Sequence, residues 1–62
     1  MYKRFEKLLE VKGVTPYKVA QETGIATSTL TDWKYGRSNP KLDKLKLLAD
    51  YFGVTLDYFV EE

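Results

Sequence analysis

Residues 16–36 read PYKVAQETGIATSTLTDWKYG, and this stretch decides the fold. It predicts two short helices joined by a tight turn. Val19 and Ala20 lie on one face of the first helix. Leu30 and Trp33, three residues apart, share one face of the second. Because of this spacing we expect Trp33 in the core rather than stacked on a base or another planar ligand.

A glycine marks the turn between these helices. Gly24 falls where the chain must reverse sharply, and a residue without Cβ takes a positive φ at little cost. Ala20 is small and lets the second helix cross close to the first. Two short helices with such a connection are the sequence form of a helix-turn-helix motif.

The second helix of this motif presents a polar outward face. A rigid helix with such a face is suited to enter the major groove of DNA. We therefore expect base contacts from the five polar residues on that face: Thr27, Ser28, Thr29, Thr31 and Asp32.

These side chains are short, so the start of the helix must come close to the groove floor. Hydroxyl groups both donate and accept, whereas threonine methyl groups pack against the thymine methyl group. Asp32 only accepts, so its best base partner is the cytosine amino group. Plainer alternatives stay open, since Thr27 to Thr29 could cap the helix and Asp32 could be a solvated surface acid.

Composition narrows the classes of protein that this chain can represent. Its 62 residues make one domain, residues 1–62, and contain neither cysteine nor histidine. Disulfides and thiolate zinc sites are therefore excluded, and the commonest metal ligand and general base is missing. The sequence has no membrane-length apolar run and no signal-like start. We expect a cytoplasmic protein that is not an enzyme and needs no cofactor, metal or small-molecule substrate.

Charge is distributed unevenly along the chain. Residues 1–31 carry a net charge of +2, residues 32–46 carry +3 and residues 47–62 carry −4. The positive charge therefore clusters directly after the predicted reading helix. This distribution favours one face that meets phosphate and an opposite end that faces away.

The remaining sequence predicts three more helices and an all-α domain. An amphipathic helix covers Tyr2 to Lys12, and Thr15 caps the next helix with Pro16 at its first position. The third helix begins at Ala26 or Thr27, where a Thr27 or Ser28 hydroxyl serves as the cap, and ends at Tyr35. The fourth runs over residues 41–52 with a core stripe that starts at Leu42, and a short fifth helix over residues 54–59 is capped by Thr55. The expected core is Phe5, Leu8, Leu9, Val19, Ala20, Ile25, Leu30, Trp33, Leu45, Leu48, Ala49, Phe52, Val54, Leu56 and Phe59.

With five helices in place, the chain resembles the phage repressor and Cro family of helix-turn-helix domains (the XRE-like, lambda-repressor-like fold). The resemblance rests on these residues in this order: Val19-Ala20, Gly24-Ile25, Leu30, Trp33, Gly36-Arg37, Pro40 and the run from Leu48 to Asp57. It implies a sequence-specific DNA-binding transcription regulator encoded by a bacterium or phage. Such proteins are usually homodimers on a palindromic operator.

The resemblance also implies which residues contact DNA. Its reading positions fall on Thr27, Ser28, Thr29 and Asp32. Pro16 stands where relatives often have a glutamine that contacts phosphate, so that contact shifts to the next two residues. The expected phosphate-binding residues are Tyr17, Lys18, Lys34, Arg37, Ser38, Asn39 and Lys41.

One alternative function uses the same fold. The chain could be a protein-interaction or antitoxin-like module in which DNA binding is secondary. Its acidic, aromatic tail could form a self-association surface that supports either function. The residues of that tail are Tyr51, Tyr58, Phe59, Val60, Glu61 and Glu62.

Overall fold

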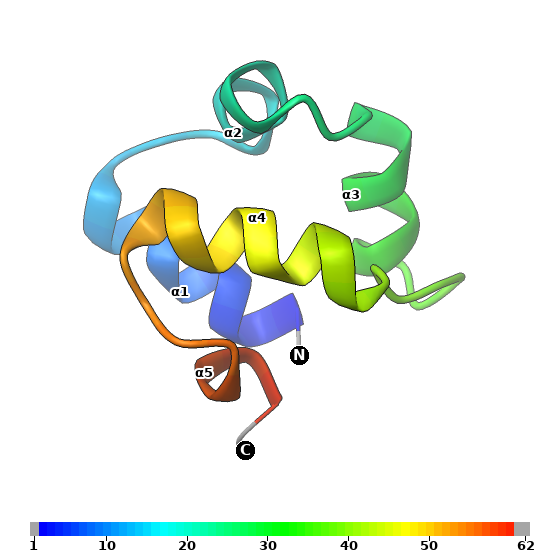
Figure 1. The fold of residues 1–62 in the computed structure, drawn as a ribbon. Coiled ribbons are helices and arrows are strands. Elements are labelled where there is room, and N and C mark those ends of the chain that lie inside the picture. Colours follow the sequence, from blue (N-terminus) through cyan, green and yellow to red (C-terminus); the bar gives the residue numbers. More distant parts are fainter. Residues whose placement is uncertain (1, 61–62) are drawn as a thin grey trace.

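The computed structural model describes residues 2–60, and Glu61 and Glu62 of the expected tail lie outside them. Within this range the chain forms five helices and no strand, which confirms the predicted all-α class. In Figure 1, α1 and α4 cross the middle of the molecule, α2 and α3 lie along its edge, and α5 lies at the end of the molecule where α1 begins. The helices are α1 (Tyr2–Lys12), α2 (Pro16–Thr23), α3 (Thr27–Lys34), α4 (Leu42–Phe52) and α5 (Asp57–Val60).

The predicted start and end of α2 are confirmed. Thr15 is the N-cap in extended conformation, and its Oγ1 accepts a hydrogen bond from the Lys18 amide at 3.2 Å. Pro16 follows as the first helical residue, where its missing N–H leaves no bond unmade. Gly24 ends the helix in the left-handed region at φ 81°, and its amide donates to the Ala20 carbonyl at 2.9 Å. Thus both ends of α2 are stabilised by residues next to it in sequence.

Twelve buried side chains form one core at the centre of the fold. Aromatic rings join its parts, since the centroid of Trp33 lies 5.2 Å from that of Phe5 and 6.3 Å from that of Phe59. Trp33 is 3% exposed, which confirms the prediction that it belongs to the core. The buried set is Phe5, Leu8, Val19, Ala20, Ile25, Leu30, Trp33, Leu45, Leu48, Ala49, Phe52 and Phe59. Three expected members, Leu9, Val54 and Leu56, pack against this core but stay partly exposed.

Two predictions at α4 and α5 are wrong. Leu42 is 68% exposed because it is the first residue of α4 and lies at the helix end, outside the stripe that Leu45 continues into the core. The fifth helix begins at Asp57, and Thr55 contributes its main-chain carbonyl, which accepts from the Tyr58 amide at 3.1 Å, rather than a side-chain cap. Because Thr55 does not cap α5, the helix is held against the rest of the fold mainly by Phe59, which is fully buried.

The ends of α3 also differ slightly from expectation. Ala26 is its N-cap and provides no side-chain hydrogen bond, and within residues 2–60 no hydroxyl replaces it. Instead the Thr29 amide donates to the Ala26 carbonyl at 3.0 Å. The helix ends at Lys34, and Tyr35 is its C-cap. The hydroxyls of Thr27 and Ser28 are therefore not used as caps.

Candidate nucleic-acid interface

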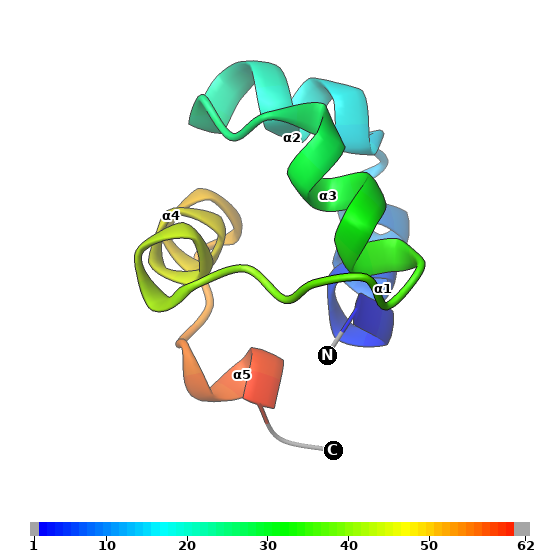
Figure 2. The same cartoon turned by 90° about the vertical axis from the view of Figure 1, so that its right-hand side faces the viewer.

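The polar side of α3 faces outward, as the sequence predicts. Leu30 and Trp33 are buried and fix the opposite side of the helix. In Figure 2 the edge of the molecule that carries α3 faces the viewer, and the loop that leaves its last turn runs across the same face. Of the expected base-reading residues, Thr27, Ser28 and Thr31 are exposed, and Thr29 and Asp32 are half-buried at the flanks.

A hydrogen-bonded turn sets the position of α3. The Thr23 hydroxyl donates to the Val19 carbonyl at 2.7 Å, and its oxygen accepts from the Ile25 amide at 3.3 Å. Ile25 is 3% exposed, so the residue after Gly24 is held in the core. This turn holds the start of α3 against α2 and gives its outward face a defined direction.

The hydroxyl groups on α3 are not equivalent. Thr31 Oγ1 donates to the Thr27 carbonyl at 3.1 Å, one helical turn earlier. Its hydrogen is therefore engaged, and Thr31 keeps an accepting oxygen and a methyl group for an outside partner. Ser28 and Thr27 retain donors as well as acceptors. The first turn of α3 consequently offers the more versatile hydrogen-bonding groups.

An ion pair joins two residues that sequence analysis treated separately. Arg37 Nε donates to Asp32 Oδ1 at 2.9 Å. The sequence predicts a base contact for Asp32 and a phosphate contact for Arg37. Their spacing of five residues does not reveal the contact by itself, because it forms only where the helix has ended and the chain reverses through Gly36 at φ 72°.

Cations surround an exposed tyrosine at the end of α3. Lys34 Nζ lies 5.6 Å and Arg37 Cζ lies 5.2 Å from the ring centroid of Tyr35, which is 63% exposed. The loop residues Ser38, Asn39 and Lys41 are also exposed. The predicted phosphate-binding residues from Lys34 to Lys41 are therefore all exposed at the end of α3 and in the loop that follows it, and we call this segment with its three cations the basic strip.

The two expected phosphate contacts at the start of α2 are partly engaged within the chain. Lys18 Nζ lies 3.9 Å from Glu22 Oε2, and the Tyr17 hydroxyl accepts from Gln21 Nε2 at 3.4 Å. Both residues remain exposed. Since these contacts lie on the surface, they compete only weakly with an outside partner.

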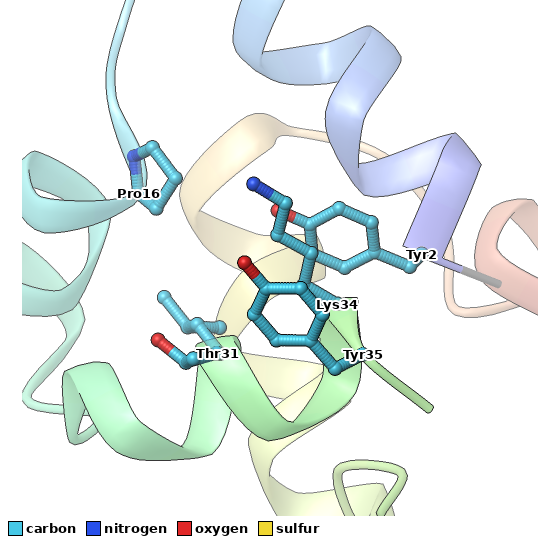
Figure 3. A pocket seen from close by; sticks show the side chains of 6 residues that line it. Tyr2, Pro16, Thr31, Lys34 and Tyr35 are labelled. Atoms are coloured by element: carbon cyan, nitrogen blue, oxygen red, sulfur yellow. The ribbon is translucent and has the colours of Figure 1, made fainter. Parts of the chain in front are cut away.

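Sequence analysis missed Tyr2 as a neighbour of this face. A shallow depression of about 170 Å³ lies beside Pro16, and Figure 3 shows the side chains of Tyr2, Lys34 and Tyr35 gathered around it. Burial raises the pKa of the Tyr2 hydroxyl, and the nearby Glu6 and Tyr35 raise it further. No local sequence pattern could have shown that Tyr2 lies here, because the start of α1 and the end of α3 are brought together only by the fold. The full lining is Tyr2, Pro16, Leu30, Thr31, Lys34 and Tyr35.

Other kinds of site find no support in the part of the chain that the structure describes. Residues 2–60 contain no group of three acidic, histidine or cysteine side chains placed to hold a metal ion. Of the same residues, none belongs to a helix that is both long and apolar enough to cross a membrane.

Comparison with known proteins supports the motif. A family model described as helix-turn-helix matches residues 5–59. The chain is also 24% identical over 54 residues to the HTH-type transcriptional activator BcrR of Enterococcus faecalis, an alignment that covers 87% of this chain and 26% of that protein. The chain thus spans about a quarter of the length of this curated relative. No solved structure matches the chain. The match over nearly its whole length shows that the chain belongs to the helix-turn-helix family.

Proposed function

We propose that this chain binds double-stranded DNA as the DNA-binding part of a transcription regulator, with α3 in the major groove. The exposed polar face of α3 beside a basic strip carries this proposal. An α-helix fits the width of the groove, and in this proposal the strip meets the phosphate backbone that borders the groove. The protein with which the chain aligns is an activator, whereas the family that it resembles contains repressors. Both control transcription with different outcomes, so our proposal covers DNA binding and not the direction of control.

Two groups of residues share the work in this proposal. Base contacts come from the first turns of α3, where Thr27 and Ser28 donate or accept and the methyl groups of Thr29 and Thr31 meet thymine. The Asp32 carboxylate already accepts from Arg37 Nε at 2.9 Å, which makes it a weaker candidate for a base contact than these hydroxyl groups. Phosphate contacts, which set affinity and register, come from Tyr17, Lys18, Lys34, Arg37, Ser38, Asn39 and Lys41.

We further propose a homodimer on a palindromic operator. A single short helix with serine and threonine readers makes few strong base contacts, and two copies double the number of bases read. The half-sites would then lie about one helical turn of DNA apart. The C-terminal part of the chain carries the exposed acids Asp50 and Asp57 and no basic residue, so it is opposite in charge to the basic strip, and we propose it for the contact with the partner copy.

Selection from a pool of random duplexes at two salt concentrations tests the proposal. We expect an enriched inverted repeat with affinity that falls steeply as salt rises. The double substitution of Thr27 and Ser28 by alanine should remove the enrichment, whereas Glu10→Ala, which removes an exposed polar side chain on α1, serves as the control. Absence of binding at both salt concentrations would contradict the proposal and favour a protein-interaction module.

A further inference from the structure

We infer that Asp32 acts on DNA through Arg37: its carboxylate holds the guanidinium ready to receive a backbone phosphate. Asp32 is in this sense a positioning residue rather than chiefly a base reader. The inference rests on the proposed function, because it concerns how this same face meets DNA. It gives a role to an acid whose negative charge would otherwise only repel the phosphate groups that bind to the neighbouring strip.

Arg37 is fixed to Asp32 by its main chain as well as its side chain. The amides of Arg37 and Ser38 both donate to the Asp32 carbonyl, at 2.8 and 3.4 Å, and Arg37 Nε donates to Asp32 Oδ1 at 2.9 Å. The Gly36 amide donates to the Trp33 carbonyl at 3.1 Å, which ties the reversal to a buried residue. The main chain at Arg37 is therefore hydrogen-bonded to the end of α3 and, through the neighbouring Gly36, to the buried Trp33.

The ring of Tyr35 supports the guanidinium from a second side. Arg37 Cζ lies 5.2 Å from the ring centroid, within the range of a cation–π contact. Because Nε is the atom that meets Asp32, both terminal nitrogens stay available. Those nitrogens form the planar fork that binds a phosphate through two parallel hydrogen bonds. A fork oriented before binding loses less rotamer freedom when the phosphate arrives.

Folding stability does not account for the pair. The side chains of Arg37 and Asp32 are 61% and 43% exposed, and exposed ion pairs stabilise proteins little. Charge alone gives the opposite expectation for DNA. If Asp32 only repels phosphate, its removal should strengthen binding, whereas loss of a positioning residue should weaken it. The sign of the effect therefore separates the two possibilities.

A double-mutant cycle on DNA affinity tests the inference. The four proteins are the wild type, Asp32→Ala, Arg37→Ala and the double variant, measured on the same random-sequence duplexes, with circular dichroism to confirm folding. We expect Asp32→Ala to weaken binding about two- to fivefold when Arg37 is present, and not to weaken it in the Arg37→Ala background. Glu10→Ala, which removes an exposed acid on α1, should not weaken binding. An increase in affinity for Asp32→Ala, equal in both backgrounds, would overturn the inference.

Two further readouts complete the test. Base preferences selected from the random pool should be retained in Asp32→Ala, and loss of cytosine at one position in both Arg37 backgrounds would show that Asp32 reads a base instead. The NMR signal of the Arg37 Nε–H in the free protein should shift in Asp32→Ala. An unchanged signal would overturn the inference even if the wild type binds DNA. If that signal shifts but the wild type binds no duplex, the contact between Asp32 and Arg37 exists and the proposed DNA-binding function is wrong.

Discussion

Substitution of Gly24 by alanine tests the turn that sets the direction of α3. Gly24 has φ 81°, and a Cβ built on it meets no atom within 4 Å. The substitution therefore adds no clash, and its cost comes from the backbone alone. For a residue with a Cβ the left-handed region costs about 1–2 kcal/mol.

The expected loss of stability follows from two opposing effects. Alanine also restricts the unfolded chain, which offsets the backbone cost by about 0.4–1 kcal/mol. We expect the free energy of unfolding to fall by about 1 kcal/mol, which corresponds to about 4–8 °C in Tm for a domain of this size. Thermal unfolding followed by circular dichroism measures this shift. Below the transition, the base preference of Gly24→Ala should match that of the wild type, because α3 keeps its direction.

Gly24→Asn is the matched control, since asparagine adopts the left-handed region more readily than alanine. It should lose less stability than Gly24→Ala. A loss above about 3 kcal/mol for alanine would show that a neighbour approaches this position and refute the open space that the structure gives it. Equal stability of the two variants and the wild type would show that φ at this position is not positive in solution.

Substitutions at three other positions test the fold. Phe59→Ala should cost about 3–5 kcal/mol because the ring is fully buried, and urea unfolding should show most of the stability lost, whereas Phe59→Leu retains part of it; a small loss would contradict the role of Phe59 in holding α5. Thr15→Ala should cost about 1 kcal/mol in thermal unfolding through loss of the cap and Thr15→Ser much less, and equal losses would exclude the cap. The pKa of Tyr51 is raised above 10.0 by its hydrogen bond to Glu22, next by burial, so its contribution to stability is complete below pH about 10 and is lost as pH rises through the raised value. Ultraviolet titration should show that Tyr51→Phe lacks an ionisation step that the wild type has at a pH above the ordinary tyrosine range. If the step that the variant lacks lies at the ordinary tyrosine pKa, the raised pKa of Tyr51 is contradicted.

Most of the fold could be predicted from sequence because local signals mark it. Thr15 and Pro16 begin α2 and Gly24 ends it, and each acts on backbone groups within a few residues. Apolar spacing located most of the core, because it is also a local signal: it shows which side of a helix is apolar. It failed at Leu42, since spacing gives the side of a helix but not whether another element covers that end.

The composition of the site could be predicted, but its internal contacts could not. A polar face on α3 follows from its sequence, and exposure of Ser28 agrees with it. The contact of Asp32 with Arg37 depends on how the chain reverses after the helix, and Tyr2 reaches the site from another helix. Both contacts are set by tertiary geometry, which periodicity does not contain.

The arrangement along α3 separates affinity from sequence preference. Its first turn carries neutral hydroxyl groups, its last turn carries Lys34, and Arg37 follows the helix. Cations at this end also offset the partial negative charge of the terminal carbonyl groups, which would otherwise repel phosphate. Because no arginine lies among the readers, the strong bidentate contact with guanine is missing from the first turn. Short readers of this kind discriminate modestly, so sequence-dependent shape and deformability of the DNA must contribute much of the preference in our proposal. An oriented Arg37 would make its contact depend on that shape, because it can hydrogen-bond a phosphate only where the shape of the DNA places one within reach.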